Sequence, residues 1–172
     1  MRTHNSEDAG LRQGGPALFR LIRFWSRRWA AGAAQDGAGD AEHVGHVLIL
    51  EAIAAALSRE RLASPGDTGR GDAAAISDVA AELGLDRSNA SRMLAAAVEA
   101  GLVTKATSAA DARRTELRMT PAGQAVLAAA RAWQEKTFLE LTASWPRADA
   151  RRLAVYLHRL ATQSIASQGE RT

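Results

Sequence analysis

The chain has 172 residues and a formal net charge of +3. That length predicts one ordinary domain, and the small net charge means that any polyanionic partner must be argued from local clusters of charge. The absence of cysteine excludes disulfides, thiol redox sensing and thiolate metal sites. No run approaches the roughly 18 apolar residues of a membrane span. The N-terminus lacks the apolar core of a signal peptide, so a cytoplasmic protein without a membrane partner is expected.

The first part of the chain is predicted to hold an arm and two helices. Residues 1–16 are polar and end in Gly-Gly-Pro, a composition typical of a flexible arm. A helix over about 17–31 then carries one apolar stripe, with its arginines mostly off that stripe. A second helix, over about 41–59, is apolar on most faces, which predicts a central buried helix. Glycine and aspartate are frequent in the segments 32–40 and 64–72, so both are expected to be surface loops.

A pair of short helices follows, with glycine at the turn between them. The first is predicted over Ile76–Leu85, with Ser77 as its N-cap and Gly84 as its C-cap glycine. The second begins at once, capped by Asp86 or Ser88. Its buried face is expected to hold the apolar residues at helical spacing, Ala90, Met93, Leu94 and Ala97. Two short helices joined in this way predict a helix–turn–helix.

Two short strands come directly after this helix pair, which ends at Gly101. They are predicted over Leu102–Thr107 and Thr115–Met119, and a polar segment joins them. Thr120-Pro121 starts a long helix, with threonine as the N-cap and proline at the first helical position, and a last helix covers about 147–167. The predicted fold is therefore mainly α with a small β-hairpin wing (α+β), a winged helix–turn–helix joined to a helical dimerisation region.

The exposed half of the second short helix is the predicted DNA-reading surface. A recognition helix presents its N-terminal residues to base edges in the major groove, where arginine can pair with guanine and asparagine with adenine. The predicted DNA-binding residues of this helix are Arg87, Ser88, Asn89, Ser91 and Arg92. A solvated polar helix face would explain any one of them equally well, but the attached basic hairpin favours DNA binding for the face as a whole.

The segment between the two strands carries two adjacent arginines, Arg113 and Arg114, which are also predicted to bind DNA. Arginine on a hairpin tip can enter the narrow, electronegative minor groove. Asp111 would repel phosphate there, so its predicted role is to position the wing by accepting hydrogen bonds or by pairing with an arginine. The alternative is a surface charge pair that contributes little.

The runs SNASRMLAAAVEAGLV, DARR and MTPAG closely resemble the MarR family of winged-helix regulators, over about Ile76–Leu127. The family's wing carries Asp-x-Arg, so the resemblance implies that Arg113 is the minor-groove residue and that Asp111 helps to position the wing. The family's Gly-Leu-Val before the hairpin matches residues 101–103. The resemblance further implies a homodimer in which the first and last helices interdigitate, and a repressor that a small-molecule effector releases from DNA.

The expected organisation is an arm, 1–16, and one domain, 17–172. Within that domain, 17–59 and 121–168 would form the helical dimerisation region and core, and 76–120 the winged helix–turn–helix DNA-binding lobe. The helices outside this lobe carry apolar stripes that a small monomer core cannot all bury, so a homodimer is expected. Two-fold dimers place their recognition helices one DNA turn, roughly 34 Å, apart. This arrangement predicts a pseudo-palindromic operator in double-stranded DNA.

Aromatic and histidine residues are the candidates for a ligand or metal site. Trp25, Trp29 and Trp133 are the candidate residues of a ligand pocket, although plain dimer core explains them more simply. His43 and His46, spaced i, i+3, could be half of a metal site. No further histidine is close in the sequence, so neither a metal nor another cofactor is expected.

An enzyme and a protein-binding module are the alternatives to a DNA-binding regulator. The sequence has no glycine-rich phosphate loop, no His-Glu metal motif and no nucleophile elbow, so no enzyme is expected. A winged helix can also bind proteins without binding DNA, and loss of the basic residues on its recognition helix and wing would favour that role. Arg92, Arg113 and Arg114 are all present. The sequence therefore favours a ligand-responsive, sequence-specific DNA-binding repressor.

Overall fold

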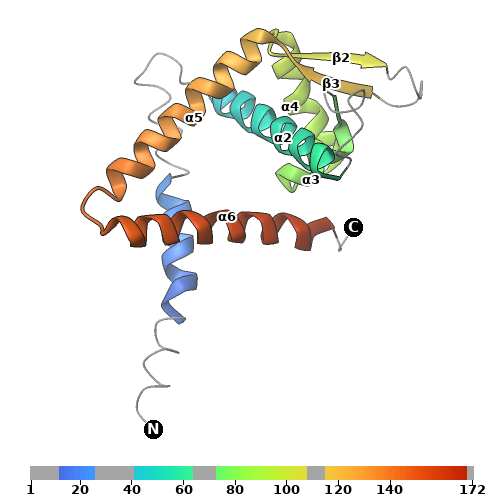
Figure 1. The fold of residues 1–172 in the computed structure, drawn as a ribbon. Coiled ribbons are helices and arrows are strands. Elements are labelled where there is room, and N and C mark those ends of the chain that lie inside the picture. Colours follow the sequence, from blue (N-terminus) through green and yellow to red (C-terminus); the bar gives the residue numbers. More distant parts are fainter. Residues whose placement is uncertain (1–11, 26–40, 64–72, 108–114, 170–172) are drawn as a thin grey trace. The chain divides into compact units, whose positions relative to one another are not determined.

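A computed structural model describes residues 12–25, 41–63, 73–107 and 115–169 (Figure 1). The chain forms two compact units, Met1–Val44 and Gly45–Thr172, and each is described by itself. No helix in the described ranges is long and apolar enough to cross a membrane.

The first unit holds a helix over the described residues 12–25. This helix includes residues 12–16, which the sequence predicted as part of an arm, so the prediction was wrong for that stretch. Glycine and proline disfavour the interior of a helix, which is why the sequence predicted that the helix begins only after Pro16. The large apolar side chains of this helix are mostly exposed within the unit: Phe19, Leu21, Ile22 and Phe24.

The second unit is built around helix α2, Ala41–Ala63, most of which lies in this unit. The prediction of a central buried helix is confirmed, because Ile49, Leu50 and Ile53 are completely buried. Figure 1 shows α2 in the middle of the unit, with α3, α4 and the beginning of α5 around it. The hydrophobic core joins α2 to residues from every neighbouring element: Ala74, Val79, Leu94, Ala97, Leu102, Val103, Leu117 and Leu127.

Two short helices, α3 (Ile76–Leu83) and α4 (Arg87–Glu99), form the predicted helix–turn–helix. Both end in the same way. Gly84 and Gly101 adopt left-handed backbone conformations with φ of 63° and 72°. The residue after each glycine donates its N–H back to the preceding helix, Leu85 to Ala80 O and Leu102 to Ala97 O. This is the Schellman arrangement, which glycine permits because it has no Cβ to clash.

The start of α3 differs from the prediction. The N-cap position is Ala75, which has no side chain to cap the helix, and Ser77 lies inside the first turn. The physical reason is a short strand, β1 (Ala74–Ala75), which leads directly into α3. Ala75 pairs with Glu116 in the sheet, so strand pairing fixes where the helix begins.

The sheet has three antiparallel strands in the order β1-β3-β2. The predicted hairpin is confirmed as β2 (Val103–Thr107) and β3 (Thr115–Met119). Val103 pairs with Met119 and Thr107 with Thr115. The central strand β3 carries the completely buried Leu117. The fold class, mainly α with a small β wing, is confirmed, and β1 is an addition that the sequence did not predict.

Helix α5, Pro121–Leu141, begins against the end of α4. Thr120 is its N-cap: the hydroxyl accepts from Gly123 N at 3.1 Å and lies 2.8 Å from Gly101 O, to which it donates. Thr120 N also donates to Leu102 O. At Gly123 a Cβ would lie 2.2 Å from Leu102 O and 3.2 Å from Leu50 Cδ2. The backbones of α5 and of the turn after α4 are therefore in direct contact.

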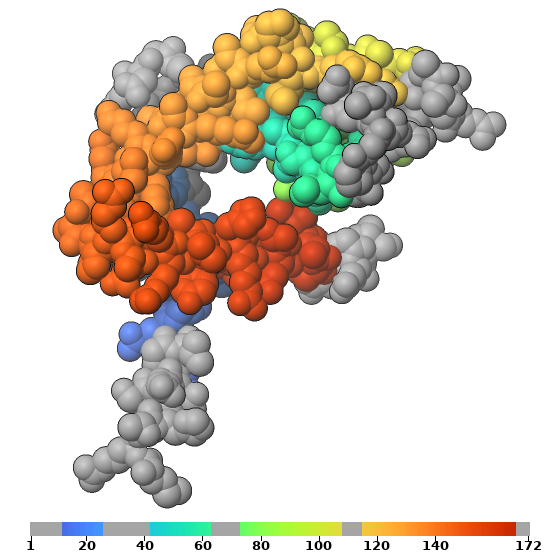
Figure 2. Space-filling model, viewed as in Figure 1, coloured from blue at the N-terminus to red at the C-terminus, as the bar shows by residue number. Residues whose placement is uncertain are grey.

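The far end of α5 and helix α6 (Arg147–Gly169) carry much exposed apolar surface. In Figure 2 no other described element of this unit covers the face of α6 that is turned to the viewer. The exposed large apolar residues of the two helices and the turn between them are Trp133, Leu139, Leu141, Trp145, Val155, Tyr156, Leu157 and Leu160. Within this unit these side chains do not belong to the hydrophobic core.

Gly123→Ala should destabilise the protein strongly. Its methyl group would overlap the carbonyl of Leu102, and backbone cannot move aside as a flexible side chain can. We expect the free energy of unfolding to fall by about 3 kcal/mol or more, as for severe overpacking, measured by urea denaturation. The matched control is Gly45→Ala in α2, where a Cβ would meet only Met93 Cε at 3.9 Å. That variant should be neutral or more stable by about 0.5–1 kcal/mol, and equal losses in both variants would contradict the packing argument.

Candidate nucleic-acid interface

Helix α4 has one buried face and one polar exposed face, as its sequence predicted. Ala90, Leu94 and Ala97 are almost completely buried, and Met93 is half-buried beside them. Of the predicted DNA-binding residues, Arg87, Ser88 and Arg92 are exposed, whereas Asn89 and Ser91 are half-buried. All five lie in the first two turns of the helix. The structure therefore places them together on the part of α4 that the core leaves accessible.

Three of the polar residues at this end of α4 are linked by hydrogen bonds. Asp86 is the N-cap, and its Oδ1 accepts from Asn89 N at 2.9 Å. Its other oxygen, Oδ2, accepts from the side-chain amide of Asn89. The amide oxygen of Asn89 in turn accepts from Nη2 of Arg92. We call this chain of side chains the Asp86–Asn89–Arg92 relay.

The carboxyl group of Asp86 is held in its charged form. The backbone N–H of Asn89 is the largest cause of a lowered pKa, followed by the Asn89 side chain. A carboxylate that accepts such hydrogen bonds is stabilised relative to the protonated acid, which cannot accept them as well. The carboxylate of Asp86 is consequently ionised and accepts these hydrogen bonds throughout the neutral pH range.

The strands of the hairpin add basic groups that the sequence analysis did not single out. Lys105 on β2 and Arg118 on β3 are both exposed. Arg118 lies 3.2 Å from the carboxylate of Glu116 on the same strand. A signal for these residues was present in the sequence, since both are charged residues within short strands of a hairpin. The predicted wing residues Asp111, Arg113 and Arg114 lie outside the described residues, so their roles stay predictions.

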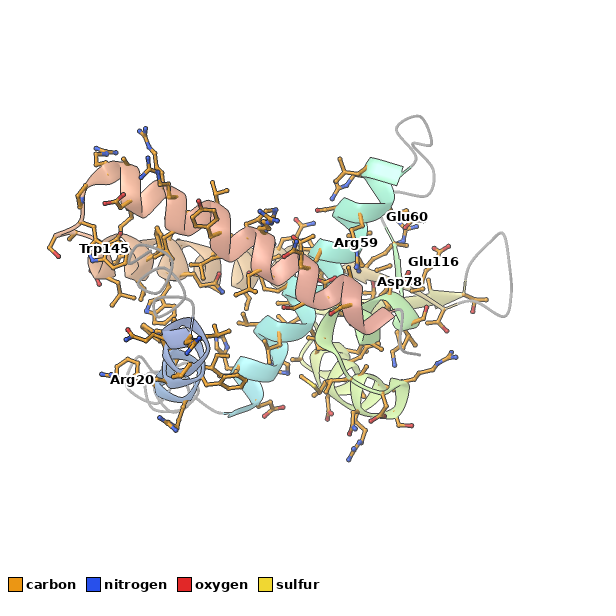
Figure 3. The ribbon with its side chains drawn as sticks, turned by 90° about the horizontal axis from the view of Figure 1, so that it is seen from below. Arg20, Arg59, Glu60, Asp78, Glu116 and Trp145 are labelled. Carbon is orange, nitrogen blue, oxygen red and sulfur yellow. The ribbon has the colours of Figure 1, made fainter. Side chains whose placement is uncertain are left out.

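Two ion pairs attach α2 to the helices around it. Arg131 of α5 binds Glu51 of α2 through two nitrogens, with Nη2–Oε2 at 2.7 Å and Nε–Oε2 at 3.2 Å. This pairing raises the pKa of Arg131, chiefly through its hydrogen bonds to the Glu51 carboxylate. At the other end of α2, Arg59 reaches Glu82 of α3 at 2.7 Å, and Figure 3 labels Arg59 there. The Arg59–Glu82 pair helps to hold α3 of the helix–turn–helix against α2, and the Arg131–Glu51 pair attaches α5 to α2.

The candidate ligand-pocket residues fall in different units. Trp25 is half-buried in the first unit and makes an edge-to-face contact with Phe24, with ring centroids 5.6 Å apart. Trp133 lies on α5 in the second unit and is 42% exposed. Trp29 lies outside the described residues. The pocket therefore stays a prediction.

The two neighbouring histidines of α2 differ in burial. His43 is half-buried, whereas His46 is only 9% exposed, and its Nε2 has no hydrogen-bond partner among the described residues. In the ranges that the structure describes, no group of three or more His, Cys, Asp or Glu side chains could hold a metal ion.

Comparisons with known proteins agree with this geometry. Residues 68–114 match a family model described as the MarR family. A search of curated protein sequences found no match. Among solved structures, the chain is similar to a MarR family transcription regulator, with 22% identity, a TM-score of 0.66 and 98% of each chain covered.

Two further structures show the same fold. The first is MepR of S. aureus in complex with DNA, with 17% identity, a TM-score of 0.54, and 86% of this chain and 95% of that one covered. The second is BpsR of Bordetella bronchiseptica, whose DNA binding is regulated by 6-hydroxynicotinic acid. It has 20% identity, a TM-score of 0.53, and 85% of this chain and 98% of that one covered. The resemblance to the MarR family is thereby confirmed, and the chain has the winged-helix fold of MarR-family transcription regulators.

Asp86→Ala should lower the melting temperature at pH 7, because α4 loses its N-cap. The pKa of Asp86 is lower in the folded protein than in the unfolded chain. Its contribution to stability is therefore complete above the ordinary carboxyl range and is lost as the pH falls through the folded pKa. The difference in melting temperature between wild type and variant should shrink in acid. Asp86→Ser keeps a capping oxygen and should retain most of the stability; a difference that stays constant down to low pH would contradict the assignment.

Proposed function

We propose that this chain, which has the MarR winged-helix fold, is a sequence-specific transcription regulator that binds double-stranded DNA. The observation that carries the proposal is the accessible polar half of α4, which holds Arg87, Ser88 and Arg92 beside a basic hairpin. An α-helix with this arrangement fits the major groove, where its first turns face the base edges. The match of residues 68–114 to the family model covers this same module and supports the proposal.

The hairpin would extend the contact beyond the major groove. Arg113 and Arg114 would enter the minor groove or bind the phosphates beside it, and Asp111 would position the wing. Lys105 and Arg118 on the strands would add phosphate contacts, which contribute affinity without sequence preference. In this division of roles α4 selects the sequence, and the wing supplies much of the salt-dependent affinity.

The regulator would act as a homodimer on a pseudo-palindromic operator. A single recognition helix reads only a few base pairs, and two-fold dimers double the site. The exposed apolar residues of α5 and α6, with those of the helix over 12–25, are numerous for a monomer, and large apolar patches mark contact surfaces. Residues 17–59 and 121–168 would accordingly supply the core and the dimer contacts, and 76–120 the DNA-binding lobe.

A small-molecule effector would release this regulator, a repressor of the cytoplasm, from its operator. BpsR, with the same fold, has its DNA binding regulated by an aromatic acid. Trp25, Trp29 and Trp133 are the proposed pocket residues, since flat apolar ligands pack well on aromatic rings. The alternative is a winged-helix module that binds protein instead of DNA, which would be favoured by a wild-type chain that lacks salt-dependent binding to any duplex.

Removal of single arginines should separate affinity from specificity. Arg113→Ala should weaken binding to all duplexes and reduce the slope of log affinity against log salt by about 1. Arg92→Ala should cost about 1–3 kcal/mol on the preferred duplex and relax the sequence preference. Fluorescence anisotropy over a salt series measures both, and thermal unfolding checks that the fold is intact. If both variants keep the affinity and the salt slope of the wild type, the DNA-facing assignment fails.

A charge on the apolar stripe of α6 should dissociate the dimer. Leu157, 40% exposed within the unit, would bury its side chain against the second subunit, and a carboxylate there would be costly to desolvate. Leu157→Glu should shift the mass measured by sedimentation from dimer to monomer. Thr162→Glu, an equal change of charge on the opposite face of α6, should leave the dimer intact. A wild-type chain that sediments as a monomer would refute the proposed dimer.

A further inference from the structure

Each polar atom of the Asn89 side chain already makes one hydrogen bond with another side chain at this end of α4. Its amide nitrogen donates to Asp86 Oδ2, and its amide oxygen accepts from Arg92 Nη2. An asparagine that reads adenine must use both ends at once, because the amide oxygen accepts from N6 and the amide nitrogen donates to N7. In the relay the bond to Asp86 uses one of the two N–H donors, the bond from Arg92 uses one of the two oxygen lone pairs, and together they fix the direction in which the amide points. Pairing with an adenine would therefore have to compete with the two contacts that Asn89 already makes.

Arg92, in contrast, uses only a small part of its hydrogen-bonding capacity in the relay. A guanidinium carries five N–H donors, and the relay uses only one of its nitrogens. The side chain is exposed, so donors remain for a second partner. Guanine presents two acceptors, O6 and N7, in the major groove, and arginine is the residue that most often pairs with both.

We infer that Asn89 is a positioning residue, which holds Arg92 through its amide oxygen, and that Arg92 alone of the two reads a base, a guanine. Asp86 completes this arrangement by fixing which way the Asn89 amide points. The inference rests on the proposed function and names the base contact that the recognition helix makes.

The geometry of a helix explains why these three residues connect. Asp86, Asn89 and Arg92 are spaced three residues apart, and side chains at i and i+3 are neighbours on a helix surface. The order of groups also matters. A carboxylate has only acceptors, so it selects the amide nitrogen of Asn89 and leaves the amide oxygen for the guanidinium. The lowered pKa of Asp86 means that this polarity persists at neutral pH.

The test is selection of binding sites from a randomised duplex library by the full chain, carried out for the wild type and for single variants. Arg92→Ala should lose a guanine preference at one position of each half-site. Asn89→Ala should relax that same guanine and no other base. The discrimination at that position should fall by about tenfold in each, within the range for one bidentate pair. The double variant Asn89→Ala, Arg92→Ala should lose no more than Arg92→Ala alone, because both remove one contact.

A change at Asp86 separates positioning from helix capping. Asp86→Asn keeps an oxygen that can accept from Asn89 N, and asparagine caps helices as well as aspartate does. Its amide nitrogen takes the place of Oδ2 and is a donor, so it cannot accept from the Asn89 amide nitrogen, and the Asn89 side chain would turn and present a donor to Arg92. We expect a melting temperature close to that of the wild type together with a weaker preference for the same guanine. Gln124→Ala, an exposed amide on α5 outside the proposed contacts, should change neither quantity.

The outcomes distinguish this inference from the proposed function. A wild-type chain that enriches no sequence would overturn the proposed function and the inference with it. If the wild type enriches a sequence and Asn89→Ala instead loses an adenine at a different position, Asn89 reads a base directly and only the inference fails. Additive effects of Asn89→Ala and Arg92→Ala at separate positions would have the same meaning.

Discussion

The winged helix–turn–helix of this protein depends on a backbone contact between the first turn of α5 and the turn that leaves α4. The carbonyl oxygen of Leu102 occupies the space that a side chain at Gly123 would need, 2.2 Å from where a Cβ would lie. The hydroxyl of Thr120 bonds to Gly101 O and caps α5 at the same place. Four elements meet here, since Leu102 joins α4 to β2 and Thr120 joins β3 to α5. The direction of the hairpin relative to α4 is therefore set by packing that tolerates little change.

This contact fixes α4 at one end and along one face, and leaves its N-terminal end accessible. The Schellman turn at Gly101 closes the C-terminal end, and Leu94 and Ala97 anchor the buried side. The N-terminal end is held differently, by an exposed aspartate and the side chains linked to it. A rigid scaffold with its polar groups already oriented loses less entropy when it binds. The same helix thus combines a core that resists movement with a surface that can be specific for a base sequence.

Most of the module could be predicted from the sequence, because its boundaries are set by local chemistry. Gly84 and Gly101 mark turns that other residues would strain, and the Thr120-Pro121 pair marks a helix start. Strand β1 could not be predicted, since two alanines give neither alternation nor length, and its pairing with β3 comes from tertiary contact. The relay was not visible in the sequence either. Asp86, Asn89 and Arg92 were each recognisable as polar residues, but their mutual bonds depend on side-chain conformations that spacing permits and does not dictate.

The first half of helix α5 packs in the hydrophobic core, whereas much of its second half is exposed. Its first turns are core: Gly123 and Leu127 are buried, and the ion pair of Arg131 with Glu51 extends the attachment to α2. Beyond Arg131 Phe138 is half-buried, but the other large apolar residues of α5 are exposed, at 42% for Trp133 and 57% for Leu141. The 21 residues form one continuous helix, roughly 32 Å long at 1.5 Å per residue. Since its first half packs closely against α2 and Leu102, a force applied to its second half would reach α4 through the packing of the winged helix–turn–helix. A domain boundary placed at Pro121 would therefore separate residues that pack together in one hydrophobic core.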